Sequence, residues 1–153
     1  QLLKNKKNYS FILETKADIL YANGYLREAK RFYEESIKLN TGNFFAKKRI
    51  FEIDFILLKN NEIMILKKLF NEFSFLIEIF PHDDDLKNKF KELALKTNHV
   101  SWKNFFSNEE KFINKQLNIK DYNHEMLKIK KITTDKILIK LLEKNIEAIN
   151  EKF

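Results

Sequence analysis

The stretch of sequence that decides the fold is residues 13–43, LETKADILYANGYLREAKRFYEESIKLNTGN. Asn23-Gly24, near its centre, is a strong turn signal. After the turn, apolar residues recur at the spacing of an amphipathic helix: Leu26, Ala29, Tyr33 and Ile37. We therefore expect one helix from Ser10, as its N-cap, to Ala22 and a second, antiparallel helix over 26–39.

The composition of the whole chain favours helices. Its 153 residues include two Gly and one Pro, far fewer turn residues than a sandwich or barrel needs. Apolar residues make up 44% and charged residues 33%, a balance typical of globular rather than disordered chains. We therefore expect an all-α fold. The abundance of Lys, Asn and Phe in every segment indicates an A+T-rich genome, and we expect a bacterial source.

Further helices are predicted by the same period and by the turn residues between them. After a Lys- and Asn-rich lead-in over residues 1–8, six more helices are expected, over 44–58, 62–80, 82–96, 102–117, 121–132 and 134–151. Pro81 ends the second of these, because the residue before a proline is biased out of the helical region. The segment 126–139 also fits a β-hairpin around Thr133-Thr134-Asp135. We prefer helices there, because the apolar stripe continues with helical period beyond Leu142.

Apolar residues cluster in the middle of the chain. The 62–80 helix is apolar nearly all round, so it is expected either at the centre of the fold or under a partner. Two aromatic pairs, Phe44-Phe45 and Phe105-Phe106, are expected in the core first and as partner anchors second. His99 with Trp102 is expected as a partly buried packing pair rather than a site.

Residues 13–43 resemble one tetratricopeptide repeat, a unit of about 34 residues that forms two antiparallel helices. The resemblance rests on five packing positions: Ala17, Leu20, Gly24, Ala29 and Tyr33. The small residues at 17 and 29 let the two helices approach closely. The chain departs from the family pattern at Leu13, Lys16, Ser36 and Thr41. Residues 44–81 have the length of a second, degenerate repeat, but they lack the glycine and the small residues.

The resemblance implies a helical repeat region over 9–81, followed without a clear linker by a C-terminal helical domain over 82–153. Families with this repeat bind peptides or protein segments along the surface formed by the first helix of each pair. Carried over to this chain, that surface consists of Glu14, Asp18, Tyr21, Phe45, Lys48, Arg49 and Glu52. Its acidic residues Glu14 and Asp18 would repel the acidic C-terminal carboxylate that some members bind. An ordinary solvated helix face is the alternative interpretation.

The sequence lacks the residue patterns of common catalytic sites. It has no Gly-rich phosphate loop, no Cys and no His-Glu-x-x-His pattern. His82-Asp83-Asp84-Asp85 offers oxygen ligands for a divalent cation, but capping of the following helix explains the same residues. We therefore expect a non-enzymatic scaffold, without metal or cofactor, that binds another protein and stabilises or positions it.

Three alternative roles and the compartment stay open. The net charge of +7 and the pI near 9.4 suggest a nucleic-acid-binding module, although the basic residues are interleaved with carboxylates. The other two alternatives are an accessory domain of a larger enzyme and a homodimer that covers the last helix. No segment is expected to span a membrane. Because the chain begins at Gln1, we expect residues upstream, and both a cytoplasmic location and export to the cell envelope or periplasm fit.

Overall fold

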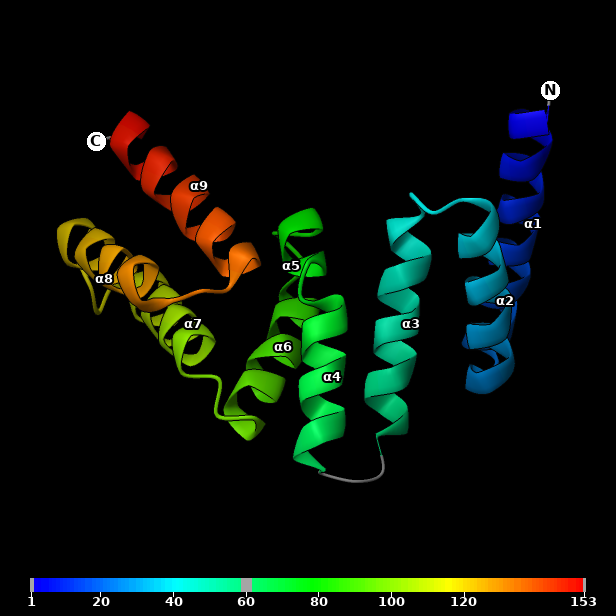
Figure 1. The fold of residues 1–153 in the computed structure, drawn as a ribbon, viewed down its shortest axis with the longest axis horizontal. Helices are drawn as coiled ribbons and strands as arrows, with labels where there is room; N and C mark the ends of the chain where they lie inside the picture. Colours follow the sequence, from blue (N-terminus) through cyan, green and yellow to red (C-terminus); the bar gives the residue numbers. More distant parts are fainter. Residues whose placement is uncertain (1, 59–61, 153) are drawn as a thin grey trace. The chain divides into compact units, whose positions relative to one another are not determined.

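The computed structural model describes residues 2–58 and 62–152, and these residues form helices without any strand (Figure 1). The helices are α1 (Leu2–Ala22), α2 (Leu26–Leu39), α3 (Phe44–Leu57), α4 (Ile63–Phe73), α5 (Leu76–Ile79), α6 (Asp84–Lys96), α7 (Val100–Ile113), α8 (Ile119–Ile132) and α9 (Lys136–Lys152). The predicted all-α class is confirmed.

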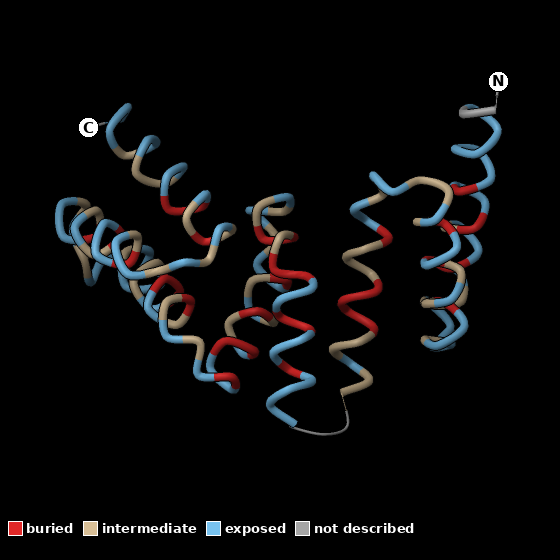
Figure 2. Tube along the Cα trace, in the orientation of Figure 1, coloured by how far each residue is buried: buried red, intermediate tan, exposed pale blue. Residues whose placement is uncertain are grey.

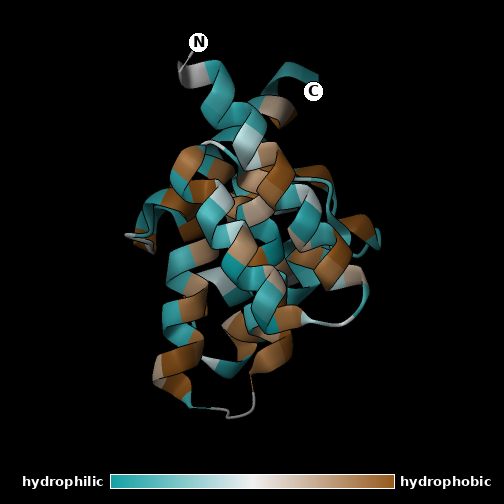
Figure 3. Cartoon of the chain, turned by 90° about the vertical axis from the view of Figure 1, so that its right-hand side faces the viewer, coloured by the Kyte–Doolittle hydropathy of each residue, from teal (hydrophilic) through white to brown (hydrophobic). Residues whose placement is uncertain are grey.

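The chain divides into two compact units, each of which is described by itself. The first contains α1, α2, α3, α5 and residues 71–73 of α4, and the second contains residues 63–70 of α4 together with α6 to α9. Figure 2 shows buried residues recurring along one side of each helix, and Figure 3 shows hydrophobic and hydrophilic residues alternating along the helices. Helices α2 and α6 to α9 are therefore amphipathic, as the sequence period predicts.

The first unit is built on the hairpin of α1 and α2, which forms where the sequence predicts it. Gly24, in the turn, has a φ of 83°, in the left-handed region where a residue with a side chain is disfavoured. The Tyr25 amide donates to the Leu20 carbonyl at 2.9 Å, which closes the end of α1. Ala17 and Ala29 are fully buried. Their small side chains allow the close approach of the two helices.

Ser10 is not an N-cap, and residues 2–8 of the expected lead-in are helical. Ser10 lies inside α1 and is buried. Its hydroxyl donates to the Ser36 carbonyl at 2.9 Å, and the Ser36 hydroxyl donates to the Ser10 carbonyl at 2.9 Å. Because the Ser10 side chain bonds to α2 rather than to amides of its own helix, it does not end α1. No Gly or Pro interrupts residues 2–10, so the helix continues through them.

The single helix expected over 62–80 is divided at Ser74 and Phe75 into α4 and α5. The Phe75 ring packs edge-on against Phe44, with ring centroids 6.2 Å apart. This packing and the burial of the two residues that follow, Leu76 and Ile77, outweigh the helical continuity that the apolar pattern predicts. The apolar residues of this segment are not all covered: Ile63, Met64, Ile65 and Ile79 are exposed.

The second unit has an aromatic core around Trp102, which is fully buried. Its ring lies 5.4 Å from Phe70, 5.8 Å from Phe105 and 5.6 Å from Phe106, measured between centroids. Phe105 and Phe106 are buried, as predicted. The half-buried His99 also packs into this core, with its ring 5.3 Å from that of Phe70.

The segment 126–139 is not a hairpin, because α8 and α9 are both helices. Between them Asp135 caps α9: its Oδ1 accepts hydrogen bonds from the amides of Ile137 and Leu138, both at 3.0 Å. Its Oδ2 accepts a third hydrogen bond from the Trp102 indole N–H at 2.9 Å. Asp135 therefore ties the start of α9 to the aromatic core.

The helix expected over 102–117 begins and ends earlier, as α7. Lys115 adopts a left-handed φ of 58°, and the Gln116 amide donates back to the Lys111 carbonyl at 2.7 Å. This arrangement closes a helix end in the same way as the turn after α1, here without a glycine. A lysine is not a helix-stop signal, which explains why the sequence pattern placed the end too late.

Candidate partner-binding face

Glu14 and Asp18, predicted on the partner-binding surface, lie one turn apart on α1 in the first unit. The Glu14 carboxylate accepts a hydrogen bond from the side-chain amide of Asn43 at 2.7 Å. Asn43 also caps α3, because its side-chain oxygen accepts from the Ala46 amide at 3.1 Å. Asn43 therefore connects Glu14 on α1 to the start of α3.

Tyr33 on α2 holds Asp18. Tyr33 is fully buried, and its hydroxyl donates to the Asp18 carboxylate, while Asp18 itself is exposed. Burial raises the pKa of Tyr33 well above its ordinary value, and the hydrogen bond and charge of Asp18 raise it further against the opposing charge of Arg49. The hydroxyl therefore keeps its proton at neutral pH, and it holds an exposed carboxylate in a fixed position.

Arg49 on α3 is held by two groups. Its guanidinium lies 4.8 Å from the centroid of the Tyr21 ring on α1, a cation–π contact. Its Nη1 donates to the Glu52 carboxylate at 2.9 Å. Burial alone would lower the pKa of Arg49, but the hydrogen bond and charge of Glu52 outweigh it, and the pKa is raised. Since Glu52 is only 7% exposed, this ion pair is less screened by water than a surface pair.

These contacts join α1, α2 and α3, and we call the set the polar network: Glu14, Asp18, Tyr21, Tyr33, Asn43, Arg49 and Glu52. The sequence pattern placed five of its members on the predicted surface, one of which, Glu52, is buried, and it placed Tyr33 among the packing residues. It missed Asn43, although an asparagine directly before an apolar helix is an N-cap signal. The pairing of Tyr33 with Asp18 has no local signal, because the two residues belong to different helices.

Phe45 and Lys48 of the predicted surface lie on α3 outside the polar network. Phe45 is 63% exposed and Phe44 is 36% exposed, so the expectation that this pair lies in the core is wrong. The buried side of α3 begins at Ala46, and the helical rotation between neighbouring residues turns Phe45 outward. Lys48 is half-buried.

The residues that define the repeat resemblance are placed inside the hairpin. Ala17, Ala29 and Tyr33 are buried, Leu20 is half-buried, and Gly24 forms the exposed turn. They therefore position the two helices, and Tyr33 also belongs to the polar network through its hydroxyl.

The polar network presents groups that can form hydrogen bonds and ion pairs. It offers fixed carboxylates, a stacked guanidinium and, one turn away on α3, an exposed aromatic ring. In residues 2–58 and 62–152, no group of three or more His, Cys, Asp or Glu side chains is placed to hold a metal ion. In the His82-Asp83-Asp84-Asp85 segment, the Asp83 side chain caps α6 by accepting from the Leu86 amide at 3.0 Å.

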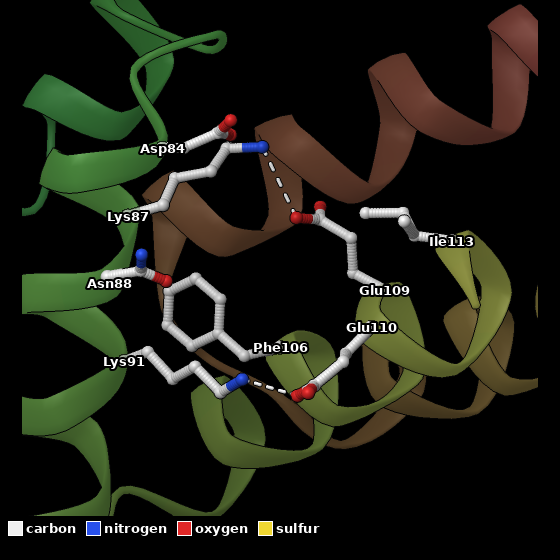
Figure 4. A pocket seen from close by; sticks show the side chains of 8 residues that line it. All are labelled: Asp84, Lys87, Asn88, Lys91, Phe106, Glu109, Glu110 and Ile113. Atoms are coloured by element: carbon white, nitrogen blue, oxygen red, sulfur yellow. Dashed lines mark hydrogen bonds and ion pairs between the residues drawn. The ribbon is translucent and has the colours of Figure 1, made fainter.

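A cleft of about 350 Å³ lies between α6 and α7 in the second unit (Figure 4). Two ion pairs cross it: Lys87 Nζ lies 3.2 Å from Glu109 Oε1, and Lys91 pairs with Glu110. The Phe106 ring lies between the two pairs (Figure 4). The cleft therefore contains charges that already bind one another and hold α6 against α7.

No family model matches this chain, and no curated protein or solved structure is significantly similar to it. None of the helices in the described ranges combines the length and the apolar character needed to cross a bilayer. The interpretation of the polar network therefore depends on its own geometry.

Proposed function

We propose that this chain is a non-enzymatic protein-interaction scaffold of the tetratricopeptide-repeat type, and that its α1–α3 side binds a segment of another protein. The observation that carries the proposal is the polar network. Side chains from three helices are bonded into fixed positions, and Asp18 remains exposed. Polar groups that are ordered before binding lose little conformational entropy when a partner binds.

The neighbouring side chains support the same role. Phe45 on α3 and Phe11 on α1 are 63% and 68% exposed, and large aromatic side chains are enriched among the residues that dominate protein–protein binding energy. The network contains three carboxylates and one guanidinium, so it favours a partner segment with hydrogen-bond donors over one with an acidic terminus.

The charge distribution supports a protein partner over a nucleic acid. In both units lysines pair with carboxylates, among them Lys30 with Asp54 and Lys130 with Glu143. Nucleic-acid-binding surfaces instead gather Lys and Arg on one face.

Site-specific photo-crosslinking in the native cell tests this proposal. A benzophenone amino acid at position 45, which is exposed on α3, should yield a discrete adduct with one protein. The matched control is position 19, where the exposed Ile19 lies on α1 but about 100° around the helix from Asp18. The combined change Glu14→Lys and Asp18→Lys should abolish the adduct at position 45. Equal adducts from both positions, or an adduct that survives the charge reversal, would contradict the proposal.

A further inference from the structure

The first unit also has a recess, and none of the residues that line it belongs to the polar network. This groove, of about 330 Å³, lies among α2, α3 and the α4–α5 segment, and seven residues line it. On α3 it is lined by Lys47 and Ile50, whereas the polar network uses Arg49 and Glu52. Residues two positions apart in a helix point in nearly opposite directions. On α3 the groove therefore lies on the side opposite to the polar network.

The floor of the groove is apolar. It is formed by Ile37 of α2, Ile50 of α3, and Phe73 and Phe75 at the α4–α5 break. Ile50 and Phe73 are 7% and 6% exposed, while Ile37 and Phe75 are half-buried and complete the wall. A recess of this volume has room for a side chain of a partner. The break between α4 and α5, which brings Phe75 against Phe44, helps to form it.

Carboxylates dominate one end of the groove. Glu34 of α2 and Glu72 of α4 both line it, and both are exposed. The nearby Lys30 is already held by Asp54, at 2.7 Å, and lies 3.8 Å from Glu34. Within the described ranges Glu72 forms no hydrogen bond or ion pair. The carboxylates of Glu34, Glu72 and Asp54 therefore share one nearby ammonium, that of Lys30.

The basic residue of the groove does not balance this charge. The ammonium of Lys47 donates to the Thr41 carbonyl at 2.7 Å and lies 5.1 Å from the centroid of the Phe44 ring. It also lies 5.8 Å from the centroid of Phe75. Lys47 is therefore directed to the opposite wall, and the Glu34–Glu72 end keeps an excess of negative charge.

We propose that this groove docks a protein segment that presents an apolar side chain next to a lysine or arginine. The apolar side chain covers Ile37, Ile50 and Phe75, and the cation lies between Glu34 and Glu72. Charge complementarity selects the partner, because an acidic neighbour would be repelled by the same two carboxylates. The groove and the α1–α3 face share no residue, so an experiment can refute binding at one surface and leave the proposal for the other in place.

The test titrates the full chain with a fluorescein-labelled peptide, Gly-Ser-Leu-Lys-Leu-Arg-Ser-Gly, and follows fluorescence anisotropy at low salt. Two matched peptides replace either both basic residues by Glu or both Leu residues by Ser, and each should bind at least about tenfold more weakly. The combined change Glu34→Gln and Glu72→Gln should weaken binding of the basic peptide by about three- to tenfold, from the loss of two exposed ion pairs. The control is Glu35→Gln, which alters an exposed neighbour outside the groove and should leave the affinity unchanged.

Methyl NMR of the isoleucines locates the peptide without any substitution. The methyl signals of Ile37 and Ile50 should shift on titration, and those of Ile19 and Ile56, exposed elsewhere in the unit, should not. No binding, equal binding of the Glu-containing peptide, or equal loss in Glu35→Gln would overturn the proposal. Shifts at Ile56 with loss of binding in Arg49→Ala would assign the peptide to the polar network instead. Concentration-dependent self-association that shifts Ile37 and Ile50 would make a second copy the occupant, and it would also overturn the proposal.

Discussion

Replacing Asp135 by alanine should destabilise the second unit by about 2–4 kcal/mol. The substitution removes an N-cap, which contributes about 1 kcal/mol. It also leaves the indole N–H of Trp102 without its acceptor at 2.9 Å, and that ring is fully buried. A buried donor without an acceptor costs about 1–3 kcal/mol. The two effects add because each carboxylate oxygen serves one of them.

Urea unfolding followed by the fluorescence of Trp102, the only Trp in the chain, measures this change directly. Asp135→Asn should cost about half as much, because one side-chain oxygen remains as an acceptor. Asp84→Ala is the matched control: Asp84 is exposed in the first turn of α6, and its loss should cost less than about 1 kcal/mol. The reasoning is refuted if Asp135→Ala costs no more than Asp84→Ala, or if the Trp102 emission spectrum of the folded protein does not change.

Three further predictions concern the turns, the hairpin and the pH dependence. Lys115→Gly should raise the free energy of unfolding by about 0.5–1 kcal/mol in urea titrations, because glycine adopts the φ of 58° without strain. Ala29→Leu should lower the melting temperature and cost about 1–3 kcal/mol, because this fully buried position has no room for a larger side chain. Burial raises the pKa of Tyr122 from its ordinary value of 10.0 to about 12, aided by the charge of Glu109 and opposed by the Asn145 hydrogen bond. The unfolded chain therefore releases the Tyr122 proton at a lower pH than the folded chain does, so the free energy of unfolding should fall as pH rises above about 10. Tyr122→Phe should remove up to about 2–3 kcal/mol of that fall.

Each of these predictions has a control in the same chain. Asn98, at φ 53°, tolerates the left-handed region better than Lys115, so Asn98→Gly should gain less. Arg27→Leu places a leucine on the exposed side of α2, where it meets no close packing, and should leave the melting temperature nearly unchanged. Tyr9→Phe, at a residue 56% exposed, should leave the alkaline loss of stability as it is. Equal effects of a variant and its control would contradict the corresponding structural argument.

The local parts of the fold could be predicted because their signals lie within a few residues of each other. The period of Leu26, Ala29, Tyr33 and Ile37 and the turn at Gly24 give the hairpin correctly. The break at Phe75 could not be predicted, because it depends on packing against Phe44, a residue far away in the sequence. Asp135 was taken for the turn of an alternative hairpin. Its cap on α9 is local, but its bond to Trp102 could not be predicted, because Trp102 belongs to another helix.

In the candidate site, too, the features set within one helix could be predicted and those that depend on packing between helices could not. The repeat pattern grouped Asp18 and Arg49 on one predicted surface, since helical spacing fixes which residues of a helix share a side. It could not show that Tyr33 donates to Asp18, because that bond depends on the angle and offset between two helices. The groove beside Ile37 also escaped prediction, because three separate segments form it only after they pack.

The reciprocal bonds between Ser10 and Ser36 have a consequence for how this chain can change over time. Each hydroxyl donates to the main-chain carbonyl of the other serine, an acceptor that any residue at that position supplies. Losing one serine therefore leaves the remaining hydroxyl with its acceptor, and an alanine of similar size fills the space, so each single change should cost only about 1 kcal/mol. Positions 10 and 36 are therefore expected to vary independently, and a lineage can lose one hydroxyl and keep the other.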